Sequence, residues 1–346
     1  MTMAHAGHRA ARRLPRYLAI PAGFGALALT LAATTPASAA VPATRSLTPI
    51  ATIAVGQNPT GIAVDQATGT AYVSCTGPSP DVYAIDEATN TVTATIPVGT
   101  YPAAVAVNSD TGTIYTANKT AGTVSVIDGA TNTVTATIPV PGAYLVATDT
   151  NNNTVFVAGS GGLSTIDGAT NTVTRTVSVG GPRAMAVNSA TKRVYVGYDY
   201  GRGGLVDVLQ AGTSKVLASI DTSFAVRAIV ADSRNNMIYV ADGTYGRHRL
   251  EGISGATNQR VKYMRVSDHQ WTGTTGVGLA VDESTDTIFL TDRDTLLQIS
   301  GKTFHRATIT SATVNALPVA ADSHTSTVYV ARYGSPNVHA YHSSVS

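Results

Sequence analysis

Cysteine is almost absent from this 346-residue sequence, which contains only Cys75. A single cysteine excludes a disulfide framework within the chain. Because Cys75 lies in an apolar, β-branched stretch, we interpret it as a buried and unreactive thiol. The fold must therefore be held by the burial of apolar surface, for which a chain of this length is large enough.

Charged residues are also scarce, at 13 % of the sequence against 43 % hydrophobic residues. The formal net charge of +2 is misleading, because residues 1–39 contain four arginines and no acidic residue. The rest of the chain has 19 basic and 21 acidic residues, a net charge of −2. It lacks the basic excess that is typical of nucleic-acid-binding proteins, so nucleic acid is not an expected partner.

Residues 1–39 have the pattern of a secretory signal peptide. Their arginines precede an uncharged run that ends in Ala37-Ser38-Ala39, an A-x-A cleavage pattern. An uncleaved membrane anchor is the alternative, which Pro21 and the small residues disfavour. We predict a secreted, extracellular protein without stable membrane insertion after cleavage. Association with the cell surface stays open, as does the choice between general and twin-arginine export.

A repeat runs through the rest of the chain. An Asp or Asn is followed seven positions later by an aromatic residue in seven units that begin 43, 41, 39, 44, 50 and 40 residues apart. The pairs are Asp65/Tyr72, Asn108/Tyr115, Asp149/Phe156, Asn188/Tyr195, Asp232/Tyr239, Asp282/Phe289 and Asp322/Tyr329. Repeats of this length indicate a solenoid or propeller.

Each unit contains four predicted strands. In the second unit they are 103–108, 113–118, 123–128 and 133–140, with period-two alternation in the last two and turn residues between them. No stretch of ten residues after the signal has a convincing helical stripe. A repeated four-stranded unit of this length is typical of a propeller blade. The sequence therefore predicts an all-β, seven-bladed β-propeller of four-stranded antiparallel blades.

The two ends of the repeat region complement each other. The seventh unit ends one strand short, whereas residues 49–55 form one additional strand before the first unit. We predict that 49–55 completes the last blade and closes the ring. The expected organisation is a signal peptide at 1–39, a short segment at 40–48 and one propeller domain at 49–346.

Three stretches of the sequence resemble the repeats of a known family. TGTAYVSC (68–75), TGTIYTAN (111–118) and AGTVSVIDGATNTVTATIPV (121–140) are similar to the YVTN-type β-propeller repeats of surface-layer and YncE-like proteins. The resemblance is strong in the first three units and weaker in the last four. It implies a propeller and a binding or surface role, and for some YncE-like members a link to DNA.

Features present in every unit are expected to serve the scaffold. We predict that the repeated Asp or Asn side chain caps the turn that follows it, with a ring of metal-binding carboxylates as the alternative. We predict that the repeated aromatic residues fill the core between blades. No metal site, cofactor or catalytic residue is predicted.

The strand order assigns the loops to two faces. Repeated turns are expected on one face, and the individual loops between second and third strands and between blades on the other. Arginines and aromatic residues on such loops are typical of a recognition surface. The predicted ligand-binding residues are Tyr198, Tyr200, Arg202, Tyr245, Arg247, His248, Arg249, His269, Trp271, Arg293, Arg332 and Tyr333.

The predicted function is a non-enzymatic binding protein. The expected partner is a glycan, an anionic small molecule or a protein, and the expected state is a monomer. An enzyme remains the alternative, a lyase or lactonase-like hydrolase that uses His248 or His269 with Asp242, Asp292 or Asp294. However, G-x-S-x-G, HExxH and P-loop motifs are all missing. A DNA-binding YncE-like protein is the second alternative.

Overall fold

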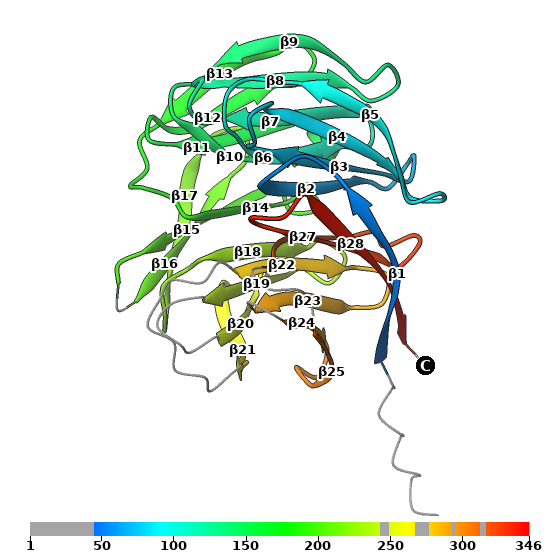
Figure 1. Cartoon of the computed structure of the whole chain (residues 1–346). Helices are drawn as coiled ribbons and strands as arrows, with labels where there is room; N and C mark the ends of the chain where they lie inside the picture. The colour runs from blue at the N-terminus through cyan, green and yellow to red at the C-terminus, as the bar shows by residue number, and fades with distance from the viewer. Residues whose placement is uncertain are drawn as a thin grey trace, which may run out of the picture. The chain divides into compact units, whose positions relative to one another are not determined.

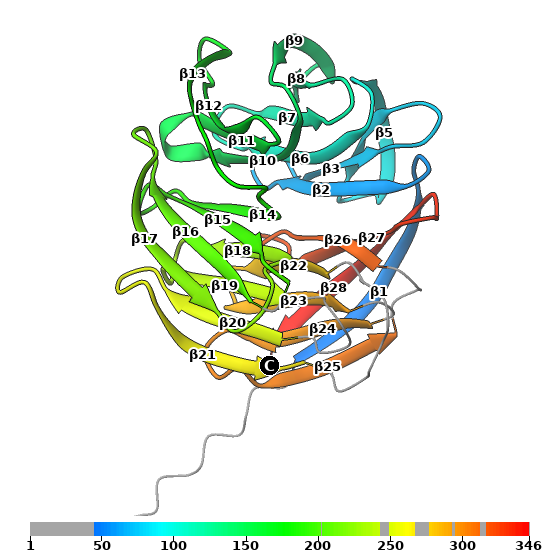
Figure 2. The same ribbon diagram turned by 90° about the vertical axis from the view of Figure 1, so that its left-hand side faces the viewer.

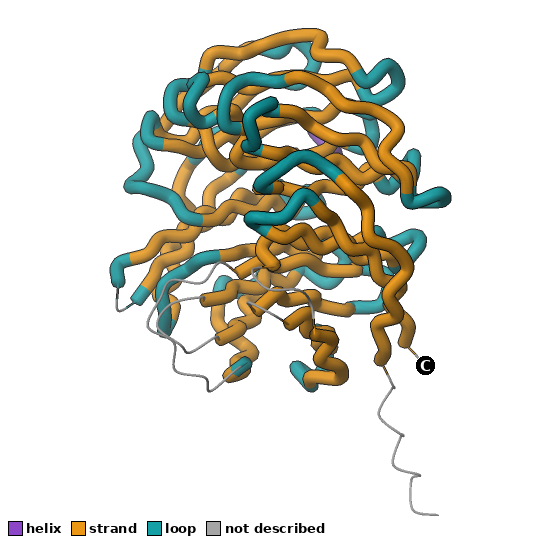
Figure 3. The backbone as a smooth tube through the Cα atoms, viewed as in Figure 1, coloured by secondary structure: helices purple, strands orange, loops and turns teal. Residues whose placement is uncertain are grey.

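The computed structural model describes residues 45–201, 203–242, 249–266, 277–292, 295–311 and 316–345. These residues form 28 strands and one 3-10 turn, η1 (Thr150–Asn152). Strands, in orange, predominate in Figure 3. The strands form seven four-stranded antiparallel sheets. This confirms the predicted seven-bladed β-propeller. In the described part of the chain, no helix has the length and hydropathy that a membrane span requires.

Blades 1 to 6 follow the chain, each with four consecutive strands. Blade 1 has β2 (Pro59–Asp65), β3 (Thr70–Cys75), β4 (Asp81–Asp86) and β5 (Thr91–Pro97), and blade 2 has β6 (Pro102–Asn108), β7 (Thr113–Asn118), β8 (Thr123–Asp128) and β9 (Thr133–Pro139). Blade 3 has β10 (Ala143–Asp149), β11 (Thr154–Gly159), β12 (Gly162–Asp167) and β13 (Thr172–Val177), and blade 4 has β14 (Ala184–Asn188), β15 (Arg193–Asp199), β16 (Gly204–Gln210) and β17 (Lys215–Thr222). Blade 5 has β18 (Ala228–Asp232), β19 (Met237–Asp242), β20 (Arg249–Ser254) and β21 (Gln259–Arg265), and blade 6 has β22 (Val277–Asp282), β23 (Thr287–Asp292), β24 (Thr295–Ser300) and β25 (Arg306–Ser311).

Blade 7 combines both ends of the described chain. It contains β26 (Ala316–Ala321), β27 (Thr327–Arg332), β28 (Asn337–Val345) and, as its outer strand, β1 (Arg45–Ala54). Figure 1 shows β1 in blue beside β28 in red. The predicted closing strand is confirmed, but it begins at Arg45, four residues earlier than expected, because these residues pair with the end of β28. A register shift at Pro49, which has no N–H to donate, accommodates the proline within the ladder.

The first strand of each blade lies against the first strands of its neighbours, including β2 against β26 at the closure. Figure 2 shows these inner strands in the middle of the domain, with outer strands such as β17 and β21 at its rim. The repeated aromatic residues are fully buried between neighbouring blades, as predicted. Tyr115 of blade 2, for example, packs with Val155 and Ile166 of blade 3.

The repeated Asp and Asn side chains cap the turns after the first strands, as predicted. In six blades the side-chain oxygen accepts a hydrogen bond from a backbone N–H two or three residues later, as in Ala67 N–H to Asp65 Oδ1 at 3.1 Å. In blade 3, Asp149 instead accepts from the side-chain amide of Asn152 at 2.7 Å. Turn capping therefore explains every copy without a ring of bound metal ions.

The repeated stretch DGATN has a comparable explanation. Asp128 Oδ1 accepts a 2.8 Å hydrogen bond from the backbone N–H of Ala130. A Cβ at Gly129 would lie 2.8 Å from the carbonyl oxygen of Gly112, which leaves no room for a side chain. Asn132 has a φ of 54°, in the left-handed region that asparagine tolerates. The copied residues are those that the tight turn requires.

Candidate functional site

Two of the cavities in the described part of the chain lie at opposite ends of the inner strands. The larger, of about 1060 Å³, lies at the turns that follow the first strands of all seven blades, from Gln66 in blade 1 to His324 in blade 7. Its lining combines polar residues of the repeated turns, such as Ser109, Asp110 and Thr150, with Val and Ala side chains and with Arg234, Glu283 and His324. This is the face that the sequence predicted to carry generic turns.

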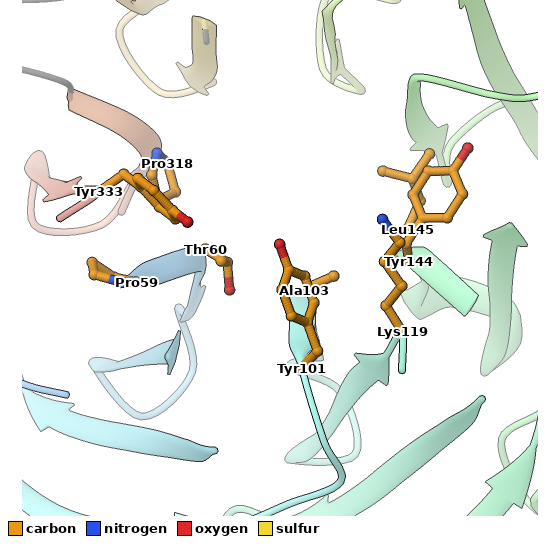
Figure 4. A pocket seen from close by; sticks show the side chains of 9 residues that line it. All are labelled: Pro59, Thr60, Tyr101, Ala103, Lys119, Tyr144, Leu145, Pro318 and Tyr333. Atoms are coloured by element: carbon orange, nitrogen blue, oxygen red, sulfur yellow. The ribbon is translucent and has the colours of Figure 1, made fainter. Parts of the chain in front are cut away.

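The smaller cavity, of about 330 Å³, lies at the opposite end of the inner strands, on the face with the individual loops. Four blades and one connection between blades contribute to it. Its lining, drawn in Figure 4, consists of Pro59, Thr60, Tyr101, Ala103, Lys119, Tyr144, Leu145, Pro318 and Tyr333. Residues from different blades meet there because each blade turns the start of its first strand toward the ring axis.

Tyr101 occupies the connection between β5 and β6 and has an unusual backbone. Its φ is 60°, a left-handed conformation that is uncommon for an aromatic residue. Two hydrogen bonds hold the connection in place, from Lys119 N–H to the Tyr101 carbonyl at 2.8 Å and from Ala121 N–H to the Thr100 carbonyl at 3.2 Å. The side chain is 40 % exposed. Backbone strain at a partly exposed ring in a cavity is a common feature of functional sites.

Lys119 follows β7 and places its ammonium group between two rings. Its Nζ lies 5.7 Å from the ring centroid of Tyr101 and 5.7 Å from that of Tyr144. Both distances are within the range of a cation–π interaction. No carboxylate among the described residues forms a salt bridge with Lys119. The cavity therefore carries a positive charge that the described part of the protein leaves uncompensated.

Tyr144 is fixed by its own hydroxyl group. The phenol donates a hydrogen bond to the carbonyl oxygen of Pro182, in the connection to blade 4. Burial raises the pKa of the Tyr144 phenol, while the positive charge of nearby Arg183 lowers it. The ring is therefore a neutral, immobilised wall of the cavity, with a second cation beside it.

Thr60 positions the inner strand of blade 1 against blade 2. Its hydroxyl donates to the carbonyl oxygen of Pro102 at 2.5 Å and lies 3.2 Å from the hydroxyl of Ser74. At the next residue, Gly61, a Cβ would lie 3.0 Å from the backbone nitrogen of Val105, so the two strands approach closely. This contact fixes the neighbouring Tyr101 connection relative to blade 1.

Tyr333 is a predicted binding residue that lines the cavity. It follows β27 in a turn in which the N–H of Ser335 bonds to the carbonyl of Arg332 at 3.2 Å and Gly334 has a φ of 82°. Its ring is partly exposed. The predicted Arg332 is half-buried at the strand end. Burial lowers the pKa of His339, and the charge of Arg332 lowers it further.

The predicted tyrosines of blade 4 have different environments. Tyr198 is 3 % exposed, whereas Tyr200 is 67 % exposed. The two rings stack with centroids 6.3 Å apart and an interplanar angle of 14°. Nearby, Arg227 forms a 2.7 Å salt bridge with Asp199. β15 is buried continuously from Val194 to Tyr198, so Tyr198 supports Tyr200 and offers no ligand surface itself.

Arg249 contacts residues of blade 5 and of the connection between blades 4 and 5. Its guanidinium lies 3.4 Å from Asp242, donates to the carbonyl oxygen of Ser223 at 3.1 Å and covers the ring of Phe224 at 5.2 Å. Asp242 is buried. The arginine therefore neutralises a buried carboxylate, which limits its availability to an anionic ligand.

The other predicted residues lie outside the described part of the chain. They are Arg202, Tyr245, Arg247, His248, His269, Trp271 and Arg293. The structure thus brings Tyr333 together with Tyr101, which belongs to the predicted face, and with Thr60, Lys119 and Tyr144, which were not predicted as site residues. Lys119 was missed because it is a single lysine in a turn of an otherwise faithful repeat. Among the described residues, no group of three or more His, Cys, Asp or Glu is arranged to hold a metal ion.

Comparison with known proteins supports the architecture. No protein-family model matches the chain, and no curated protein matches its sequence. The chain is a seven-bladed β-propeller, and it is structurally similar to a chain of hydrazine synthase from Kuenenia stuttgartiensis. The TM-score is 0.70 with 18 % sequence identity, over 82 % of this chain and 95 % of that chain. Since 1354 chains of solved structures are significantly similar, the likeness shows a widely shared fold alone.

Proposed function

We propose that this chain is a secreted β-propeller of the YVTN-type repeat class that binds a ligand without catalysing a reaction. The binding face is the one with the second-to-third-strand loops and the connections between blades. A single observation carries the proposal: on that face, Tyr101, Tyr333 and Lys119, which has no salt bridge with any described residue, surround a preformed cavity. Partly exposed aromatic rings on loops of a rigid scaffold are typical of recognition surfaces.

The chemistry of the cavity favours binding over catalysis. Its lining includes no carboxylate and no imidazole, the groups that most often act as general acid or base. It contains instead ring faces, phenol groups and one ammonium group, which together recognise a ligand by stacking, hydrogen bonding and charge. The individual loops of blades 4 to 7 extend this recognition face, with Tyr200 as an exposed aromatic residue.

The proposal is tested by measuring binding to libraries of glycans and anionic small molecules. Three proteins are compared: the wild-type chain, a Tyr101→Ala/Tyr333→Ala double variant and a Thr131→Ala control. Thr131 lies in an exposed repeated turn, so its replacement changes the opposite face. We expect a ligand whose binding is lost in the double variant and kept in the control. Equal binding by all three proteins would overturn the assignment of this face. Turnover of the ligand would favour the enzyme alternative. An affinity for DNA that falls steeply as the salt concentration rises would favour the DNA-binding alternative.

A further inference from the structure

The cavity combines features that a single ring-shaped ligand can use together. Tyr101 and Tyr333 lie on opposite sides of blade 1, Tyr101 in the connection to blade 2 and Tyr333 in blade 7. Their hydroxyl groups point toward the middle of the cavity (Figure 4). No described residue forms a hydrogen bond with either hydroxyl group within the structure. Two phenol groups are therefore available to donate to or accept from a polar rim.

The walls between these polar groups are apolar. Pro59, Pro318, Ala103 and Leu145 contribute aliphatic surface, and the tyrosines contribute ring faces. Thr60, the remaining polar residue, already donates its hydroxyl hydrogen to the Pro102 carbonyl. A matching ligand has a flat apolar face and polar groups around its edge. A pyranose ring has this distribution, with axial C–H groups on its faces and hydroxyl groups at its edge.

The charge and the size of the cavity restrict the ligand further. Lys119 has no carboxylate partner among the described residues, and Arg183 lies close enough to Tyr144 to affect its titration. An anionic substituent would compensate the ammonium charge through a charge-assisted hydrogen bond. The volume of about 330 Å³ is at the lower end of small-molecule sites, so it accommodates one ring and not an oligosaccharide chain.

We propose that this cavity binds a uronic acid residue, a pyranose that carries a carboxylate group; this inference rests on the proposed binding function. The carboxylate lies at the Lys119 ammonium group, the C–H face of the sugar stacks on an exposed tyrosine ring, and the sugar hydroxyls meet the phenols of Tyr101 and Tyr333. An aromatic carboxylate would use the ring faces and the lysine but would leave both phenol groups without partners. A neutral hexose would leave the ammonium group uncompensated.

The test is isothermal titration calorimetry of the purified chain with D-glucuronate, D-galacturonate, D-glucose and benzoate. We expect at least one uronate to bind about tenfold or more tightly than glucose, as one charge-assisted contact provides. It should also bind more tightly than benzoate, which leaves both phenol groups without partners. In Lys119→Gln the preference over glucose should fall to about parity, whereas Lys119→Arg should retain most of it. Melting temperatures of both variants show whether they fold. The Thr131→Ala control should bind as the wild type does.

Three results would overturn the inference. The first is that glucose binds as tightly as the uronates. The second is that benzoate binds more tightly than any sugar, and the third is that Lys119→Gln keeps the preference for uronates over glucose. A library ligand that is neutral or not a sugar, with binding lost in Tyr101→Ala/Tyr333→Ala, would reject the uronate and retain the binding function. If no ligand depends on Tyr101 and Tyr333, the proposed function fails as well.

Discussion

The carboxyl groups of Glu87 and Asp322 contact each other across the junction between blades 1 and 7. Glu87 lies in the turn between β4 and β5, at the position that Gly129 and Gly168 occupy in blades 2 and 3. Both carboxyl groups are buried, and Oε1 of Glu87 and Oδ2 of Asp322 have no other hydrogen-bond partner among the described residues. A proton on Glu87 allows its carboxyl group to donate to Asp322.

This contact makes the ring closure sensitive to alkaline pH. The pKa of Glu87 is raised to about 8, first by burial and then by the hydrogen bond to Asp322 and its negative charge, while the hydroxyls of Thr325 and Tyr329 act in the opposite direction. Because the folded-state pKa lies above the ordinary value of 4.5, the folded state binds the additional proton. The stabilisation is complete below pH 4.5 and is lost as the pH rises through 8.

Glu87→Gln should therefore stabilise the protein at pH 9. The neutral amide has the size of the protonated acid and donates to Asp322 at every pH, which avoids two adjacent buried charges. We expect a gain of about 1–3 kcal/mol in the free energy of unfolding at pH 9 and little change at pH 5. The measurement is urea unfolding at both pH values. Asp110→Asn, which neutralises an exposed turn carboxylate, is the matched control and should show no such difference. A gain of equal size at pH 5 and 9 would contradict the protonation of Glu87 in the folded state.

The closing strand β1 provides a second prediction. Ile53 is 4 % exposed and packs with Ala71 and Val73 of blade 1, whereas Ile50 on the same strand is 46 % exposed. Ile53→Ala should lower the free energy of unfolding by about 2–4 kcal/mol, and Ile50→Ala by less than about 0.5 kcal/mol. Denaturant unfolding measures both. Similar losses for the two variants would show that β1 is not anchored by its buried face.

The scaffold could be predicted from the sequence because every blade has the same requirements at its turns and at its junctions with neighbouring blades. The turns after the first strands need an Asp or Asn at their start, and the junction between blades needs a large aromatic residue such as Tyr115. The two residues recur seven positions apart, so the sequence records this pair seven times. The position of β1 followed from the same count of strands.

The site could be predicted only in part. Lys119 and Tyr144 lie in different blades, and Tyr333 lies near the other end of the chain, so no local spacing indicates that they meet. Their convergence depends on the closure of the ring. Tyr198 illustrates the converse, because β15 continues to Asp199 and is buried as far as Tyr198, a tyrosine that sequence position alone assigned to a loop.

Cys75 offers a simple test of the core. Its thiol is fully buried in β3, and burial raises its pKa to about 12, so almost no thiolate is present at pH 8. We expect negligible reaction with Ellman's reagent in buffer and one equivalent of thiol in concentrated guanidinium chloride. The rate of reaction at intermediate denaturant then reports on opening of blade 1. Rapid and complete reaction of the native protein would contradict the burial.

The last prediction concerns the left-handed backbone of Tyr101. A non-glycine residue in this region costs about 1–2 kcal/mol, a strain that glycine does not experience. Tyr101→Gly should therefore raise the free energy of unfolding by about 1 kcal/mol, while Tyr101→Ala keeps the strain and should gain nothing. Both variants remove the ring and should lose ligand binding.

Denaturant unfolding and calorimetry on the same protein preparations separate the two effects. If the glycine variant is more stable than both the wild type and the alanine variant but does not bind, the tyrosine is retained at a cost in stability for the sake of recognition. If the glycine variant is the least stable of the three, the Tyr101 ring contributes more to the packing of Lys119 and Tyr144 than its backbone strain costs, and the residue is primarily structural.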